Sequence, residues 1–207
     1  MTISISSPPP STRWRDVPTL VETNAPDTYA REVKRRPVGY HPSRAVDRTS
    51  SWMFTDGSGS GWYGLVVLRP GRSPRLIARE EPLTTSVAAE VNGLLLALDT
   101  CETTERVTVV SDYLWSIYYV LGWYDSHAPT LIEQVRRARS ILAAKGPAEL
   151  RYVHTRGHRQ DGTDIGFWNH VADRLCDARM RFDGEVSEDA LRRHLGARQP
   201  LRDLLRA

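Results

Sequence analysis

Three short apolar runs open the patterned part of the chain. They are "SSWMFT" at residues 50–55, "GWYGLVVLRP" at 61–70 and "PRLIARE" at 74–80, and the turn-forming sequence "PGRSP" separates the second from the third. Runs of this length, bounded by glycine, proline and serine, are typical of strands. Three in succession predict an antiparallel meander.

The hydrophobic period changes after the third run. Apolar residues now recur three and four positions apart, at Val87, Val91, Leu94, Leu95 and Leu98. This spacing places them on one face of a helix, so the sequence predicts an amphipathic helix over residues 86–100.

Strands and helices alternate in the pattern that follows. "RVTVVSD" at 106–112 is typical of a buried strand, and "YLWSIYYVLGWY" at 113–124 is apolar and helical in character. A second helix is expected to begin at "TLIE", where Thr130 and Glu133 form a capping box, and to end at the "GP" of residues 146–147.

The last part of the pattern completes an α/β order. "ELRYVHT" at 149–155 alternates as a strand, and "WNHVADRLCDARM" at 168–180 predicts a helix after a polar loop. The order β-β-β-α-β-α-α-β-α predicts helices packed on a mixed sheet. The tail at 183–207 is expected to hold one or two short helices interrupted at Pro200.

The first 49 residues have a different composition. "SSPPPSTRWRDVP" is rich in proline and serine and cannot form regular structure over a long stretch. A basic cluster follows, made of Arg31, Lys34, Arg35, Arg36 and Arg44. The segment is interpreted either as a solvated leader that packs loosely on the domain or as an arm that follows phosphates.

Bulk composition excludes several classes of protein. With 207 residues, 40% apolar and 26% charged, the chain is typical of a soluble globular protein. No apolar run approaches the roughly 18 residues that span a bilayer, and export is not expected from the N-terminal pattern. Cys101 and Cys176 lie far apart, so neither a disulfide framework nor a zinc site is expected, and a cytoplasmic location is predicted. The net charge of +3 only weakly indicates a polyanionic partner.

Two carboxylates interrupt the apolar pattern. Asp56 directly follows the first predicted strand, although an Asp-Gly pair between apolar runs also favours a hairpin turn. Glu90 shares the apolar face of the helix at 86–100. A buried carboxylate is costly unless it is paired or binds a metal. Glu90 can instead lie at the edge of that face and reach solvent.

Two more acids lie in comparable positions. Asp112 ends the strand at 106–112, and its alternative role is an N-cap for the next helix. Asp173 lies on the last helix, four residues after Asn169, and its alternative is a surface salt bridge with Arg174.

Four acids on four elements can converge at one end of the sheet. Crowded carboxylates repel one another and stay protonated or splay apart without cations. Mg²⁺ prefers such oxygen ligands, and two ions about 4 Å apart activate water and stabilise the leaving oxygen in phosphodiester cleavage. The pattern therefore favours two Mg²⁺ ions, for which Mn²⁺ can substitute.

Five motifs along residues 50–182 resemble those of type 1 ribonuclease H. They are "FTDGS", "TTSVAAE", "VTVVSD", "TRGH" and "WNHVAD". The resemblance implies a ribonuclease H-like three-layer fold: a five-stranded mixed sheet, three strands antiparallel and then parallel strands, with helices on both faces. The chain then divides into a Pro/Arg-rich extension at 1–49, a catalytic domain at 50–182 and a helical tail at 183–207.

The resemblance also implies site residues. The expected metal ligands, all counted as catalytic, are Asp56, Glu90, Asp112 and, for the second ion, Asp173. His158 corresponds to a mobile catalytic histidine that assists proton transfer or product release, a task that suits an imidazole titrating near neutral pH. His154 competes for this role but lies inside a strand, where packing is favoured. Substrate contacts are expected from Gly57, Ser58, Ser86 and Asn169.

The sequence departs from the family at positions that read the RNA 2′-hydroxyl. Bacterial members often carry asparagines before the catalytic glutamate and a glutamine two residues after the third carboxylate, where this chain has Ser86, Val87 and Leu114. The preference for a hybrid is therefore less firmly indicated than the cleavage chemistry.

The basic handle helix of some members is replaced by "GWYDSHAPT". Nearby aromatic residues are interpreted either as scaffold or as surfaces that stack on DNA: Trp115, Tyr118, Tyr119, Trp123 and Tyr124. The basic N-terminal segment is a candidate electrostatic replacement for the handle.

Three functions fit these observations. The favoured one is a Mg²⁺- or Mn²⁺-dependent endonuclease, monomeric and without a membrane partner, that hydrolyses the RNA strand of RNA–DNA hybrids to leave 3′-hydroxyl and 5′-phosphate ends. A nuclease of the same fold that acts on structured DNA, as junction resolvases and transposase-like relatives do, is the first alternative. The second is a catalytically silent nucleic-acid-binding module, which the retained acids and histidine disfavour.

Overall fold

The computed structural model describes residues 19–32, 34–36, 38–41, 43–82, 85–157 and 162–206. Its strands are β1 (Thr19–Thr23), β2 (Val38–Tyr40), β3 (Ser51–Gly57), β4 (Trp62–Leu68), β5 (Arg75–Glu80), β6 (Arg106–Ser111), β7 (Glu149–His154) and β8 (Phe182–Glu185). Its helices are α1 (Pro26–Glu32), α2 (Ser86–Thr100), α3 (Leu114–Leu121), α4 (Pro129–Lys145), α5 (Asp164–Ala178), α6 (Glu188–Gly196) and α7 (Leu201–Leu205).

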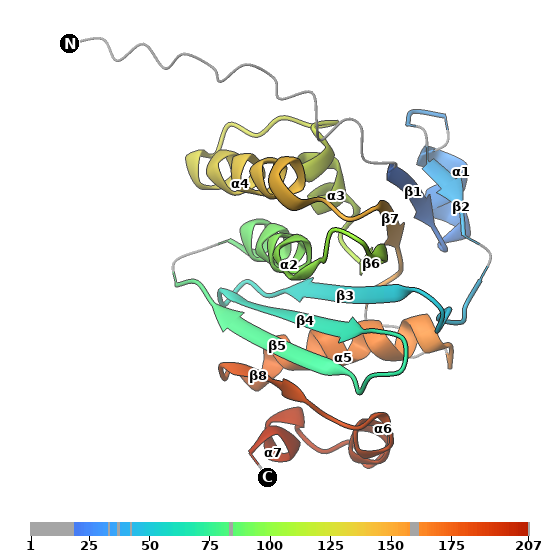
Figure 1. The fold of residues 1–207 in the computed structure, drawn as a ribbon. Helices are drawn as coiled ribbons and strands as arrows, with labels where there is room; N and C mark the ends of the chain where they lie inside the picture. The colour runs from blue at the N-terminus through green and yellow to red at the C-terminus, as the bar shows by residue number, and fades with distance from the viewer. Residues whose placement is uncertain are drawn as a thin grey trace.

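The strands form one mixed sheet in the order β2-β1-β7-β6-β3-β4-β5-β8 (Figure 1). Strands β3, β4 and β5 make the expected antiparallel meander, and β6 and β7 continue from β3 as parallel strands. The predicted order of nine elements is therefore confirmed from β3 to α5. The sheet of the described residues has eight strands rather than the expected five, because both flanking segments add to its edges.

The N-terminal segment differs from the solvated leader that its composition predicts. Residues 19–40 include β1, α1 and β2, and β1 pairs in parallel with β7, with Thr23 opposite His154. In Figure 1 this unit lies at one edge of the sheet beside β7. The proline- and serine-rich stretch before residue 19 lies outside the described residues.

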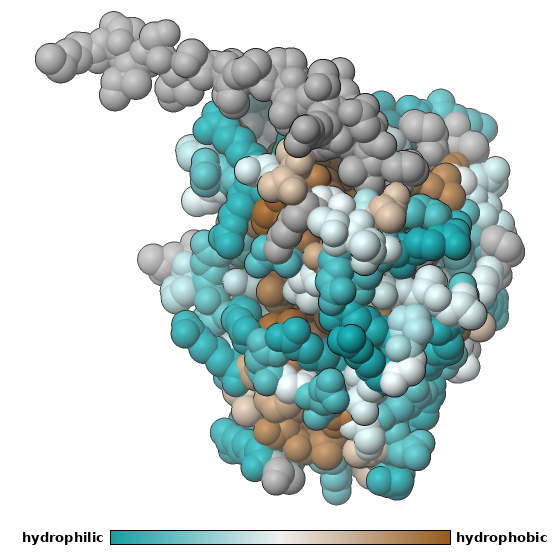
Figure 2. Space-filling model, viewed as in Figure 1, coloured by the Kyte–Doolittle hydropathy of each residue, from teal (hydrophilic) through white to brown (hydrophobic). Residues whose placement is uncertain are grey.

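The tail joins the opposite edge of the sheet. Strand β8 runs antiparallel to β5, and α6 and α7 follow it. Leu191 and Leu201 are almost fully buried against the apolar residues of α5. Figure 2 shows apolar residues gathered at the lower end of this face, over the place where Figure 1 draws α6 and α7.

Helices cover both faces of the central sheet. α2 packs on β3 and β4 with α4 behind it, and α5 packs on the same strands from the other side. Met53 therefore joins one apolar core, and its neighbours Trp52 and Phe54 join the other. Burial on both faces explains why these strands have continuous apolar runs rather than alternation. Within the described part of the chain, no helix has the length and apolar character to cross a membrane.

The start of α4 differs from the prediction. The helix begins at Pro129 with Ala128 as its N-cap, and the cap makes no side-chain hydrogen bond. The expected capping box of Thr130 and Glu133 is therefore wrong. Proline at the first helical position has its φ fixed for a helix and lacks the N–H that a cap satisfies, so it starts the helix without one.

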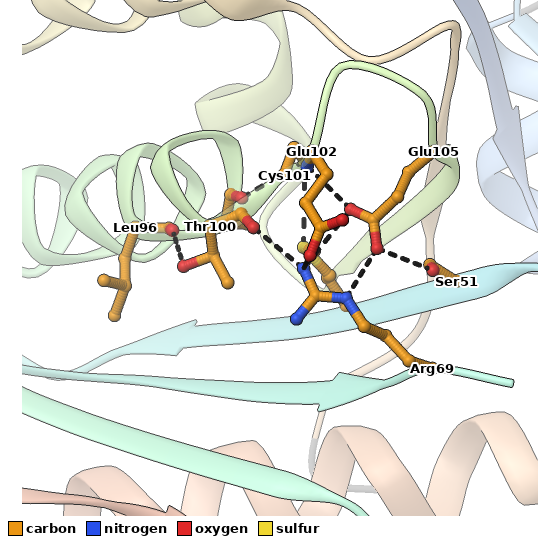
Figure 3. Close-up of polar contacts among 9 residues, drawn as sticks. Ser51, Arg69, Leu96, Thr100, Cys101, Glu102 and Glu105 are labelled. Carbon is orange, nitrogen blue, oxygen red and sulfur yellow. Dashed lines mark hydrogen bonds and ion pairs between the residues drawn. The ribbon is translucent and has the colours of Figure 1, made fainter. Parts of the chain in front are cut away.

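A cluster of ionic contacts secures the end of the sheet far from Asp56. The Arg69 guanidinium donates to Glu105 Oε1 at 2.5 Å and to the Thr100 carbonyl at 2.9 Å (Figure 3). Glu105 also accepts from Ser51 Oγ at 3.1 Å and from the Glu102 N–H at 2.8 Å. These bonds tie β3 and the end of β4 to the turn between α2 and β6.

Candidate active site

Three carboxylates from separate elements meet at one edge of the sheet. Asp56 is the penultimate residue of β3, Asp112 directly follows β6, and Glu90 lies on α2. Because β3 and β6 are parallel neighbours, with Thr55 opposite Ser111, their carboxyl ends lie together. One oxygen from each of the three acids lies within 4.8 Å of the other two.

Glycine permits the close approach of β3 to α2. A Cβ atom on Gly57 would lie 2.3 Å from the backbone of Ala89 and Glu90, which no side chain tolerates. The Gly57 N–H donates to the carboxyl groups of both Asp56 and Glu90. The Asp-Gly pair is therefore part of the strand, and the hairpin turn comes after it, where the Ser58 N–H donates to the Trp62 carbonyl at 2.8 Å.

Burial and mutual repulsion oppose ionisation of these acids. Burial, followed by the charges of Asp112 and Asp173, raises the pKa of Asp56 to about 7. Burial, followed by the charges of Asp56 and Asp112, raises the pKa of Glu90 well above its ordinary range. Glu90 is 8% exposed, so the alternative in which it reaches solvent from the edge of the helix is wrong.

Asp173 adds its charge to the group from α5. It is among the causes of the raised pKa of both Asp56 and Glu90. Asp173 Oδ2 lies 3.6 Å from His170 Nδ1, whereas Arg174 pairs with Asp177 at 2.6 Å. The predicted alternative of a salt bridge with Arg174 is therefore not found among the described ion pairs.

Asp112 is held from two sides. Asn169 donates from Nδ2 to Asp112 Oδ2 at 3.3 Å, and a Cβ on Gly157 would lie 2.5 Å from the same oxygen. Asp112 is not the N-cap of α3, because Tyr113 occupies that position without a side-chain cap bond. Its carboxylate is thus part of the group with Asp56 and Glu90.

The two candidate histidines lie in different situations. His154 is buried at the end of β7, its ring bonds the backbone of Asp112, and its Nδ1 lies 2.9 Å from Thr23 Oγ1. Burial lowers the pKa of His154 to about 4, so it stays neutral in the core, as its position in a strand predicts. His158 lies outside the described residues, directly after Gly157 in the sequence.

The residues predicted to contact substrate lie on three elements of the structure. Ser58 follows Gly57 in the turn, where its Oγ lies 2.8 Å from Ser60 Oγ. Ser86 is the exposed first residue of α2, and a Cβ on Gly59 would lie 3.9 Å from its Cβ. Asn169 differs from Ser58 and Ser86, because its side chain contacts Asp112 directly.

Two supporting contacts escaped the sequence interpretation. The Cys176 thiol donates to the Asp56 carbonyl at 3.4 Å, and a Cβ on Gly93 would lie 3.2 Å from that same carbonyl oxygen. The glycine was a visible signal within an otherwise helical pattern, where glycine is costly without a packing reason. The cysteine carried no signal, since a buried thiol normally behaves as a small apolar residue.

The residues present fit divalent cations. Glu90 Oε2 is buried without a hydrogen-bond partner among the described residues, and the pKa of Glu90 and of Asp56 is raised. A cation beside these oxygens would satisfy the orphaned atom and remove the repulsion at once. Carboxylate oxygens are the ligands that Mg²⁺ and Mn²⁺ prefer.

Comparison with known proteins gives structural matches only. No protein-family model and none of the curated proteins matches the sequence. The N-terminal RNase H domain of rv2228c from Mycobacterium tuberculosis is 21% identical, with a TM-score of 0.46 over 61% of this chain and 95% of that chain. RNase H1 from Halobacterium salinarum NRC-1 is 18% identical, with a TM-score of 0.45 over 61% and 92%. LC11-RNase H1, solved in complex with an RNA/DNA hybrid, is 20% identical, with a TM-score of 0.46 over 61% and 96%.

Proposed function

We propose that the protein is a metal-dependent endonuclease that hydrolyses the RNA strand of RNA–DNA hybrids and leaves 3′-hydroxyl and 5′-phosphate ends. The observation that carries the proposal is the meeting of Asp56, Glu90 and Asp112 within 4.8 Å of one another at the carboxyl ends of β3 and β6. Three of the five motifs that resemble type 1 ribonuclease H each contain one of these acids.

The chain would hold two divalent cations with its acids. Asp56, Glu90 and Asp112 would bind directly, and Asp173 would join them for the second ion. When bound, such ions supply an activated water and stabilise the leaving oxygen of a phosphodiester. The Gly57 N–H and Asn169 Nδ2 orient the carboxylates by hydrogen bonds, so that little reorganisation is needed on binding.

His158 is proposed to move the proton at the leaving 3′-oxygen. Support comes from its sequence neighbour Gly157, where an added Cβ would lie 2.5 Å from Asp112 Oδ2. The substitution His158→Ala is expected to lower kcat more than KM, and the pH profile of kcat distinguishes this from a structural defect.

One cleavage assay tests the proposal. Labelled RNA–DNA hybrid, duplex DNA, duplex RNA and a four-way DNA junction are each offered with Mg²⁺. Cleavage of only the RNA strand of the hybrid, with the predicted ends on the fragments, is the expected result. Cleavage of the junction instead would show that the protein is a nuclease for structured DNA. Binding without cleavage would show that the protein is not an enzyme on these substrates.

Matched variants connect the activity to the acids. Asp112→Asn is expected to lower cleavage by about 100-fold or more, since loss of supporting groups alone costs 10–100-fold at metal sites. Asp189→Asn, an exposed aspartate on α6, is the control and leaves cleavage unchanged. Equal activity of the Asp112 variant and the control would contradict the assignment.

A further inference from the structure

A pocket of about 330 Å³ lies between the added N-terminal unit and the candidate active site. Arg31, Glu32 and Arg35 of the N-terminal unit line one side, and Asp112 and Trp115 line the other. The pocket therefore reaches a proposed catalytic acid, although four of its ten lining residues come from a segment outside the ribonuclease H-like motifs.

The acid that the N-terminal unit contributes to the pocket, Glu32, already has an ion-pair partner. Glu32 is buried, accepts from Arg31 Nε at 3.0 Å and accepts from the Tyr118 hydroxyl at 3.0 Å. Arg35 is exposed, and its side chain makes no hydrogen bond or ion pair with another described residue. The pocket thus presents the Arg35 guanidinium, which has no direct ion-pair partner among the described residues, beside Arg31, whose Nη groups make no contact there.

Aromatic side chains continue this surface past the pocket. Trp115 is 42% exposed and Tyr124 is 40% exposed, and their rings meet edge to face at 4.6 Å. Arg36 lies over the Tyr124 ring at 5.2 Å and donates to the Trp123 carbonyl at 3.3 Å. Guanidinium groups interleaved with exposed rings form the kind of surface that follows a nucleic-acid strand.

The backbone that carries the arginines is held in place by the sheet. β1 pairs with β7 along its whole length, the Asn24 N–H donates to the His154 carbonyl at 3.0 Å, and Tyr118 anchors Glu32 at the end of α1. Figure 1 shows the unit packed beside β7 rather than extending from the domain. The backbone that carries the arginines is thus in place before a ligand binds, so only side-chain entropy is lost on binding.

We propose that Arg35 and Arg31 form a phosphate-binding subsite for a phosphodiester of the bound nucleic acid, next to the reacting one. The proposal rests on the proposed function, because proximity to Asp112 is what assigns the phosphate to the substrate. Two guanidinium groups match phosphate oxygens in charge and hydrogen-bond geometry, and Trp115 lies where a neighbouring sugar or base would stack.

The test compares Arg35→Gln and the double variant Arg31→Gln/Arg35→Gln with Arg72→Gln, an exposed arginine at the far end of the sheet. Binding of a fluorescent hybrid is measured in the Asp56→Asn background, so that the probe stays intact. We expect the Kd of the double variant to rise about tenfold and the slope of log Kd against log salt to fall by about 1 per lost contact. In the active protein, KM rises while kcat at saturating hybrid stays within about twofold.

Hybrids with one neutral methylphosphonate linkage identify the strand. If the arginines contact a phosphate of the cut strand, a hybrid in which that linkage is neutral should bind the native chain and the Arg35 variant with the same Kd. If the two Kd values become equal when a linkage of the opposite strand is neutral, the subsite binds that strand. Absence of coupling with linkages of either strand overturns the proposal.

Failure of the subsite and failure of the function give different results. A native chain that cleaves hybrid, with arginine variants equal to the Arg72 control in Kd and salt slope, overturns the subsite only. A native chain that binds hybrid through these arginines without cleaving it overturns the endonuclease and leaves the subsite. Circular dichroism and thermal unfolding of each variant exclude misfolding. Arg35→Gln changes an exposed side chain, whereas the double variant also removes the ion pair of the buried Glu32, so the single variant carries the comparison if the double variant loses stability.

Discussion

Asp56 holds a carboxyl group where burial and two neighbouring acids oppose its ionisation. Its pKa is raised from the ordinary 3.8 to about 7. The folded state therefore binds this proton more tightly than the unfolded chain does. Without divalent cations, the stability that the group contributes is fully present below about pH 4 and is lost as the pH rises to about 7.

We expect this loss to appear in the metal-free protein. The free energy of unfolding of the native chain, measured with urea and a chelator, should fall relative to that of Asp56→Asn between about pH 4 and about pH 7. Added Mg²⁺ should reverse the fall at the upper pH, because cations favour the ionised acids. A native-minus-variant difference that is constant or grows with pH would contradict the raised pKa.

Gly57 shows that one missing side chain positions two catalytic candidates. Alanine at this position would place its Cβ 2.3 Å from the backbone of α2, so the helix that carries Glu90 would have to move. We expect Gly57→Ala to lower the free energy of unfolding by about 3 kcal/mol or more, as overpacking against backbone does. Gly59→Ala is the control, since its Cβ would meet nothing closer than 3.9 Å. Equal thermal stability of the two variants would refute the close contact.

At the scale of elements, β3 joins the candidate site at its carboxyl end to an ionic cluster at its first residue. Its carboxyl end carries Asp56, and its first residue, Ser51, donates to Glu105 (Figure 3). Burial raises the pKa of Glu105, but hydrogen bonds from Arg69 and the Glu102 N–H outweigh it, so the pKa is lowered. The stability that this group contributes is therefore present above its ordinary pKa of 4.5 and is lost as the pH falls through its lower pKa in the folded state.

Removing this charge tests the cluster. Glu105→Gln is expected to lower the free energy of unfolding at neutral pH by about 2 kcal/mol, because the side chains of Arg69 and Glu105 are only 13% and 11% exposed. Glu133→Gln, on a side chain that is 75% exposed, is the control and should change stability by less than about 0.5 kcal/mol. The free energy of unfolding of both variants is measured with a chemical denaturant. Equal values for the two variants would show that the cluster contributes no more than a surface ion pair does.

Short edge strands explain where the sequence was least informative about elements. β2 has three residues and β8 has four, too few for a period of two to be recognised. β8 reads "FDGE" and alternates between half-buried and exposed positions, so its composition resembles a loop. Such strands form because β1 and β5 offer unpaired edges, which is a property of the assembled sheet.

For the whole molecule, the flanking segments are parts of one structure. Both edges of the sheet come from outside residues 50–182, except that β8 begins at Phe182. Leu191 of α6 is fully buried with residues of α5 and the central strands. The tail should therefore unfold together with the domain.

Leu191→Ala measures this coupling. We expect a loss of about 3 kcal/mol in the free energy of unfolding, with a single cooperative transition, as for other buried leucines. Leu20→Ala, at a leucine that is 43% exposed, should stay within about 0.5 kcal/mol of the native value. A separate early transition of the tail, or no loss in Leu191→Ala, would show that the tail is independent of the core.

The sequence alone determined the elements between residues 50 and 182 and the acids Asp56, Glu90 and Asp112. Their signals are local: hydrophobic period fixes the type of each element, and a charge within an apolar run is recognisable without coordinates. Only the tertiary structure decided that these acids meet, that Asn169 holds Asp112 and that α1 brings arginines beside them. Such contacts join residues far apart in the chain, and their energies come from burial and pairing that exist only once the sheet has formed.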